Sequence, residues 1–143
     1  LVYLKLPGEN AAPAFAPADL AHGPWQMFPR DTAAVALISD GRWRLPPNPV
    51  DWTLRPFLAA PIAVRRAPAS RLTVVLMAAP EEGFAIAMPH QTEGHYSVYL
   101  SLGGRDMKTG ETVRLRSRLW VAAGPTDAQI LEQYQRWLGS VRR

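Results

Sequence analysis

The sequence contains no cysteine and no long apolar run. The lack of cysteine excludes disulfides, thiol catalysis and cysteine-based zinc sites, and it leaves the compartment open, so a periplasmic or secreted location is compatible with it. No apolar stretch approaches the roughly 18 residues of a membrane-spanning helix, and we therefore expect no membrane partner. The opening LVYLKL reads as a strand and has no basic segment followed by an apolar one, so we do not expect it to be a signal peptide.

Signatures of nucleotide chemistry and of serine nucleophiles are also missing. The chain has neither a phosphate-cradling loop nor a GxSxG elbow, and SLGGRD lacks the strand–turn–helix context that a nucleotide site needs. The formal net charge is +4, but the basic residues are dispersed apart from an arginine row and the terminal Arg142 and Arg143. The pattern does not favour nucleic acid, and we expect no cofactor.

The length and composition indicate one folded domain. With 143 residues, 48% of them hydrophobic, the chain is long enough to bury a core of its own. Residue 1 is leucine and already belongs to a strand-like segment, so we expect a processed chain or part of a larger domain or protein. Fourteen prolines, mostly before residue 70, predict short strands joined by ordered loops.

Runs of β-branched and aromatic residues predict an all-β fold. The expected strands are Val2–Leu6, Ala33–Ser39, Arg42–Leu45, Ile62–Arg66, Arg71–Ala78, Gly83–Met88, His95–Leu102 and Glu111–Val121. Asp40-Gly41 predicts a hairpin between the second and third of these strands. The strand Arg71–Ala78 is apolar on both faces, which predicts a central, covered position. The last two strands alternate strictly and are separated by GGRDMKTG, a pattern typical of an antiparallel hairpin.

The alternation in Glu111–Val121 divides its side chains between two faces. We expect a core face of Val113, Leu115, Leu119 and Val121. The outer face then carries Arg114, Arg116, Arg118 and Trp120. A capping box of Thr126 and Gln129 opens one C-terminal helix. The apolar stripe of this helix has helical spacing and comprises Ile130, Leu131, Tyr134, Trp137, Leu138 and Val141. The sequence thus predicts a single antiparallel β-sandwich over residues 1–143 with one C-terminal helix.

Two stretches resemble galactose mutarotase-like proteins. GPWQMFPRDTAAVALISDGRWRL is similar to the region of that family where a Pro-Trp turn leads into a buried strand and a Gly-Trp hairpin. YLSLGGRDMKTGETVRLRSRLWVAAGPTDAQILEQYQRWL resembles the close of such a domain, with two strands and a terminal helix. The resemblance implies the C-terminal part of a large β-sandwich (supersandwich) domain that deals with carbohydrate. The family's catalytic histidine and glutamate motifs have no counterpart here, so no catalytic residue is carried over.

The first candidate site lies between two predicted strands. His90, Glu93 and His95 could bind a metal or act as acid and base on a sugar hydroxyl. The same residues could equally be the polar tip of a loop. Two histidines and one glutamate make an incomplete metal shell, and we therefore expect no metal.

Two further candidates are binding surfaces. The outer row of Arg114, Arg116 and Arg118 with Trp120 could bind an anionic saccharide, because guanidinium groups suit carboxylates and an indole can stack on sugar C–H groups. The alternatives are a solvated face or internal pairing of the arginines. Trp25, Trp43 and Trp52 could form an aromatic platform, or they could be half-buried structural residues.

These observations leave three classes of function. The first is a carbohydrate-associated β-sandwich, a non-catalytic accessory or binding part of a sugar-active protein. The second is a sugar-active enzyme of the mutarotase, epimerase, lyase or hydrolase kind that uses a histidine. The third is a protein-interaction domain whose exposed edge recruits a partner strand. Because Val2–Leu6 starts at residue 1 and would leave an unpaired edge, we also expect a homodimer or a missing remainder of the chain beside it.

Overall fold

The computed structural model describes residues 1–89 and 97–141, and its strands form two packed sheets. Sheet A contains, in spatial order, β2 (Ala14–Ala16), β1 (Val2–Leu4), β5 (Leu58–Ala67), β6 (Leu72–Ala78) and β9 (Ser117–Ala123). Sheet B contains β4 (Thr53–Leu54), β3 (Trp25–Pro29), β7 (Gly83–Pro89) and β8 (Tyr99–Leu102). All pairs are antiparallel except the parallel pair β3–β4. The predicted all-β sandwich is confirmed.

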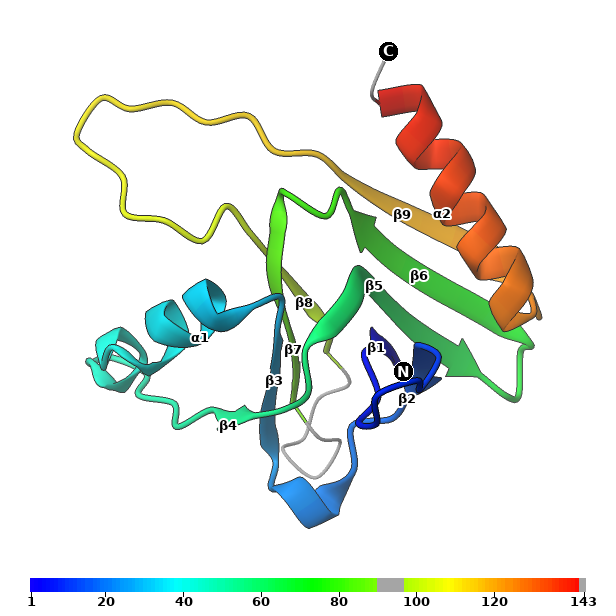
Figure 1. Ribbon diagram of the computed structural model, residues 1–143, viewed down its shortest axis with the longest axis horizontal. Coiled ribbons are helices and arrows are strands. Elements are labelled where there is room, and N and C mark those ends of the chain that lie inside the picture. The colour runs from blue at the N-terminus through cyan, green and yellow to red at the C-terminus, as the bar shows by residue number, and fades with distance from the viewer. Residues whose placement is uncertain (90–96, 142–143) are drawn as a thin grey trace.

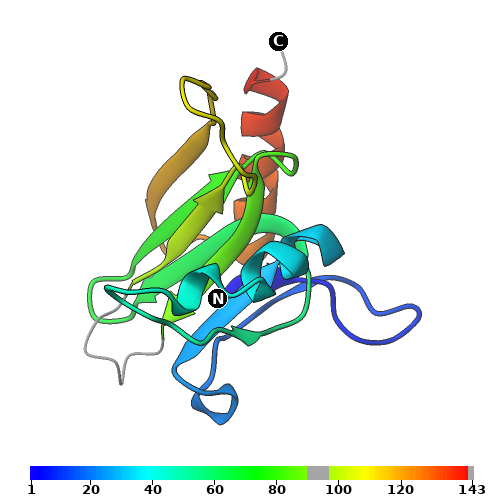
Figure 2. The same ribbon diagram turned by 90° about the vertical axis from the view of Figure 1, so that its left-hand side faces the viewer.

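Two α-helices cover the outer faces of the sandwich. Figure 1 shows four layers from left to right, which are α1 (Thr32–Ser39), sheet B, sheet A and α2 (Asp127–Val141). Figure 2 looks onto the α1 side. Two short 3-10 helices, η1 (Leu20–His22) and η2 (Arg42–Arg44), lie in the connections. Among the described residues, no helix is long and apolar enough to cross a membrane.

Each interface between layers has its own apolar core. The core between the sheets contains Val2, Leu4, Phe28, Leu58, Ala63, Ile86 and Met88. The core under α2 contains Ile62, Val64, Val75 and Met77 from sheet A, together with Ala79 just after β6. The core under α1 is smaller and contains Met27, Ile38, Ala85 and Ala87. Successive residues of β5 and β7 point to opposite faces, and each of these strands therefore serves two cores.

The C-terminal helix forms as its sequence predicts. The Gln129 backbone N–H donates to Thr126 Oγ1 at 3.2 Å, and the Thr126 N–H donates to Gln129 Oε1 at 2.8 Å, which completes the capping box. The apolar stripe faces sheet A, where Trp137 is only 7% exposed. The Tyr134 hydroxyl donates to the Ala78 carbonyl oxygen at 3.0 Å and so ties the helix to the end of β6.

The prediction of two strands around Asp40-Gly41 is wrong. Residues 32–39 form α1 instead of a strand, and residues 42–44, which were predicted to form the return strand, form η2. Asp31 supplies the helix signal, because its Oδ1 accepts the Ala34 N–H at 2.9 Å as an N-cap. Alanine has the highest helix propensity, and the alanines that follow this cap outweigh the β-branched Val35 and Ile38.

The predicted hairpin between the last two strands is also wrong. The two strands belong to different sheets, since β8 pairs with β7 and β9 pairs with β6. The segment between them, residues 103–116, crosses from one sheet to the other and is the yellow loop that projects in Figure 1. Only the second half of the predicted strand Glu111–Val121 is a strand, and Val113 lies exposed before it.

The two faces of β9 are reversed relative to the prediction. Trp120 packs toward α2 and is partly buried, whereas Leu119 and Val121 are 62% and 52% exposed on the other face. The same face of β6 carries Leu72 and Val74, which are also exposed, so β6 is central in the sheet but its first half is covered on one face only. The reason is that α2 covers the Trp120 side, while sheet B does not reach as far as β9.

The open edges of the sheets differ from those expected. The strand Val2–Leu6 was predicted to border missing sequence or a second copy of the chain, but β1 pairs with β2 on one side and with β5 on the other. Within the described ranges, the edge strands are β2 and β9 in sheet A and β4 and β8 in sheet B. Since β8 packs over β6, β9 extends one strand beyond sheet B.

Candidate functional site

Three tryptophans gather on the outer face of sheet B, beside α1. Trp25 begins β3, Trp43 lies in η2, and Trp52 directly precedes β4. The ring centroids of Trp25 and Trp52 are 5.9 Å apart, and those of Trp43 and Trp52 are 6.0 Å apart. Both pairs are edge-to-face, the arrangement that the charge distribution of aromatic rings favours. The three tryptophans that the sequence offered as a possible platform therefore lie in one cluster.

The strand pairing explains why the tryptophans meet. In the parallel pair β3–β4, Gln26 is opposite Thr53, so the residues before them, Trp25 and Trp52, are neighbours. The Val50 N–H donates to the Trp43 carbonyl oxygen at 2.7 Å, which holds the η2 loop against the segment leading to β4. The third ring is thus fixed by the backbone and not only by contact with its neighbours.

The cluster lines a cavity of about 290 Å³, which we call the tryptophan cavity. Its lining consists of Trp25, Met27, Trp43, Val50, Trp52, Ala87, Tyr99 and Ser101. Met27, Ala87 and Tyr99 are register partners across β3, β7 and β8 and form a row along the floor. The small Ala87 between two larger side chains leaves the hollow, and Tyr99 is 49% exposed beside it.

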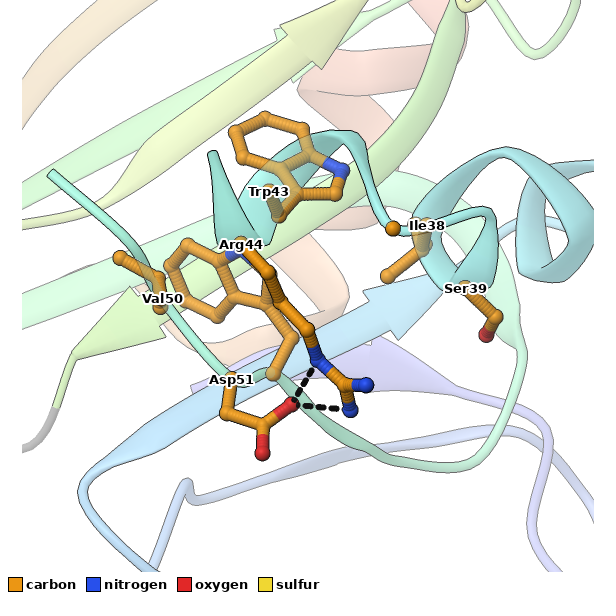
Figure 3. A pocket seen from close by; sticks show the side chains of 8 residues that line it. Ile38, Ser39, Trp43, Arg44, Val50 and Asp51 are labelled. Atoms are coloured by element: carbon orange, nitrogen blue, oxygen red, sulfur yellow. Dashed lines mark hydrogen bonds and ion pairs between the residues drawn. The ribbon is translucent and has the colours of Figure 1, made fainter. Parts of the chain in front are cut away.

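A second, smaller cavity shares three residues with the first. It measures about 80 Å³ and is lined by Ile38, Ser39, Gly41, Trp43, Arg44, Val50, Asp51 and Trp52. Figure 3 shows the Arg44 and Asp51 side chains pointing toward each other at its rim. Asp51 Oδ1 accepts both Arg44 Nε at 2.9 Å and Arg44 Nη2 at 2.6 Å. We call this cavity the ion-pair cavity.

The polar groups around the cluster are mostly paired. Arg42, on the other side of Trp43 in sequence, forms ion pairs with Asp40 at 2.6 Å and with Asp106 at 3.0 Å. The hydrogen bond from the Arg42 guanidinium lowers the pKa of the Asp40 carboxyl below its ordinary value. The Trp52 Nε1–H is buried and has no hydrogen-bond partner among the described residues. The Trp52 ring lines both cavities, but its N–H is turned away from solvent.

The predicted arginine row does not form one open surface. Arg116 is held by Glu82, whose Oε1 accepts Arg116 Nη2 at 2.9 Å and whose Oε2 accepts the Arg116 backbone N–H at 2.6 Å. Arg116 Nη1 also donates to the Val141 carbonyl oxygen at 2.6 Å. Arg114 is exposed before β9 begins, while Arg118 and Trp120 lie on the face toward α2. Internal pairing of Arg116 is the alternative that the sequence left open.

The structure does not test the predicted histidine site. His90, Glu93 and His95 lie outside the described residues. Within residues 1–89 and 97–141, no group of three or more histidine, aspartate or glutamate side chains is placed to hold a metal ion. Tyr99 and the Arg44–Asp51 pair are new members of the site. The only sequence signal for the pair was the position of its two members next to Trp43 and Trp52.

Comparisons with protein-family models, with curated proteins and with solved structures yield no match to this chain. The resemblance to galactose mutarotase-like domains therefore stays a prediction from the sequence.

Proposed function

We propose that this chain is a non-catalytic carbohydrate-binding β-sandwich, an accessory or binding part of a sugar-active protein, and that the tryptophan cavity is its ligand site. The observation that carries the proposal is the convergence of three partly exposed indoles and Tyr99 on one open hollow of a sheet face. The C–H faces of a sugar ring carry slight positive charge and are attracted to the negative face of an aromatic ring.

The size and polarity of the site agree with this ligand class. A volume of about 290 Å³ lies at the lower end of small-molecule sites, which suits one or two sugar rings better than a deeply buried cofactor. The polar groups stand at the edge of the apolar floor, where the exposed Arg44 and Asp51 side chains can meet ligand hydroxyls. A few placed polar groups around an apolar surface are typical of sites that fix a ligand's orientation.

Binding to oligosaccharides, screened on a glycan array and measured by calorimetry, tests the proposal with Trp43→Ala. We expect its affinity to fall by about ten- to thirtyfold, because truncation of an aromatic anchor at a binding site typically costs about 1.4–2 kcal/mol. The melting temperature of the variant checks that the fold is retained.

Trp120→Ala is the matched control, because it removes an equally half-buried indole from the opposite side of the molecule. We expect its affinity to stay at the parent level. If Trp120→Ala lost binding while Trp43→Ala kept it, the site would be the arginine row predicted from the sequence. If the parent bound no glycan at all, the proposed function would be wrong.

A further inference from the structure

We infer that the tryptophan cavity selects neutral sugars over acidic ones, such as uronates. This inference rests on the proposed function and concerns which saccharide the site accepts. The sequence suggests the opposite, since Trp43 is flanked by two arginines, Arg42 and Arg44, and an Arg-Trp-Arg triplet is what a site for anions would contain.

Among the described residues, each guanidinium group next to Trp43 in the sequence is paired with at least one carboxylate. Arg42 faces the two carboxylates of Asp40 and Asp106, and Arg44 faces the carboxylate of Asp51. Three carboxylates therefore surround two guanidinium groups, and the local balance is slightly negative. An acidic sugar brought to this surface would have to compete with Asp51 for Arg44 while it was repelled by the carboxylates.

The geometry of the Arg44–Asp51 pair supplies what a neutral sugar needs. Both hydrogen bonds from Arg44 end on Asp51 Oδ1, so that Asp51 Oδ2 accepts no bond from the described residues. Arg44 Nη1 likewise donates to none of the described residues. The pair thus presents an acceptor at its Asp51 end and a donor at its Arg44 end, both at the rim of the ion-pair cavity (Figure 3).

A hydroxyl group can donate and accept at once, whereas a carboxylate can only accept. One sugar hydroxyl can donate to Asp51 Oδ2, and a different hydroxyl of the saccharide can accept from Arg44 Nη1. A uronate carboxylate can use the donor only, and it meets the Asp51 charge at the other position. The cavities share Trp43, Val50 and Trp52, which places this polar pair next to the stacking floor.

The decisive variant is Asp51→Asn, which removes the carboxylate that neutralises Arg44 and changes side-chain size very little. The probes are galacto-oligosaccharides and oligogalacturonates of equal length, titrated into the parent and the variant by calorimetry at two salt concentrations. For the parent we expect binding of the neutral series, weaker binding of the acidic series and little dependence on salt. For Asp51→Asn we expect affinity for the acidic series to rise by about two- to fivefold, since exposed ion contacts are individually weak, and to fall again as salt increases.

Asp106→Asn is the matched control, because it removes a nearby carboxylate while Arg42 keeps its pair with Asp40. We expect this control to change the preference less than Asp51→Asn does, because every guanidinium group beside Trp43 keeps a carboxylate partner. Stronger binding of the acidic series by the parent, lost in Trp43→Ala, would overturn the inference and leave the proposed site in place. Equal binding of both series, unchanged in Asp51→Asn, would also overturn it. Absence of binding to either series in a chain that also binds nothing on the glycan array would instead contradict the proposed function.

Discussion

At the scale of single residues, Arg116 shows how a side chain predicted to bind ligand takes a structural role. Its guanidinium and its backbone N–H both bond to the Glu82 carboxylate, and Glu82 is largely buried at the end of the β6–β7 turn, directly before β7. A charge in that position needs a partner, because a buried carboxylate without hydrogen bonds is costly. The arginine therefore joins the crossover to the β6–β7 turn and, through Val141, to the end of α2.

We predict that Arg116→Ala lowers the free energy of unfolding by about 1–2 kcal/mol, less than a fully buried charged pair would lose because the arginine is half exposed. Denaturant unfolding measures the change. Arg114→Ala is the control, since Arg114 is exposed just before β9, and it should unfold at the parent midpoint. Equal midpoints for both variants and the parent would show that the Glu82 contact contributes nothing, and saccharide affinity should be unaffected in either case.

The α2 helix carries the clearest prediction at the scale of elements. Trp137 fills the interface between α2 and sheet A, and Ile130, Tyr134 and Leu138 complete the same buried stripe. Truncation to alanine leaves a cavity that neighbouring side chains fill only in part. We expect Trp137→Ala to cost about 3–5 kcal/mol in unfolding free energy. A parent-like denaturant midpoint would mean that α2 is a loosely attached tail.

The elements also show what a sequence pattern can and cannot determine. The α2 helix was predictable because its cap, its spacing and its length all agree. The α1 helix was missed because its Val and Ile residues resemble a strand, and the Asp31 cap is a single side chain. Alternation located β9, but period two only separates two faces and does not say which face is buried. The Trp120 face is the buried one because α2, which follows β9 in the chain, covers it.

The candidate site was predictable to a similar extent. Trp25, Trp43 and Trp52 could be singled out from the sequence, because large aromatics in proline-rich loops are few and conspicuous. Their meeting depends on the parallel register of β3 with β4, which no local pattern encodes. The Tyr99 contribution depends on β8 joining sheet B instead of pairing with β9. The pairing of Arg44 with Asp51 is likewise a product of the tertiary fold.

At the scale of the whole molecule, sheet A is wider than the sheet that covers it. The uncovered part of its inner face contains Leu72, Val74, Leu119 and Val121, next to the open edge of β9. Apolar side chains beside an unpaired strand edge are typical of surfaces that associate. The dimer expected from the sequence stays a prediction, and this face is where we would look for it.

We predict that Leu119→Lys reduces self-association measured by light scattering at high concentration and changes the unfolding free energy by less than about 0.5 kcal/mol, as is usual for an exposed position. Leu45→Lys is the matched control, because Leu45 is 64% exposed and far from this face in the chain. Equal scattering by the two variants would show that the β9 face plays no special part. A parent that is monomeric at every concentration would contradict the expected dimer.

The crossover between β8 and β9 divides the molecule into two unequal pieces. Residues 105–114 are all exposed, and everything after them, β9 and α2, attaches to sheet A from outside at one edge and one face. The β9–α2 piece can therefore bind to the rest of the molecule without passing through it. If the chain were cut within the crossover, the larger piece would keep the β6 edge that pairs with β9 and the face of sheet A that packs against α2. The smaller piece would be the β9–α2 segment that binds there. This fold is thus suited to fragment complementation, in which two separately made fragments restore one domain.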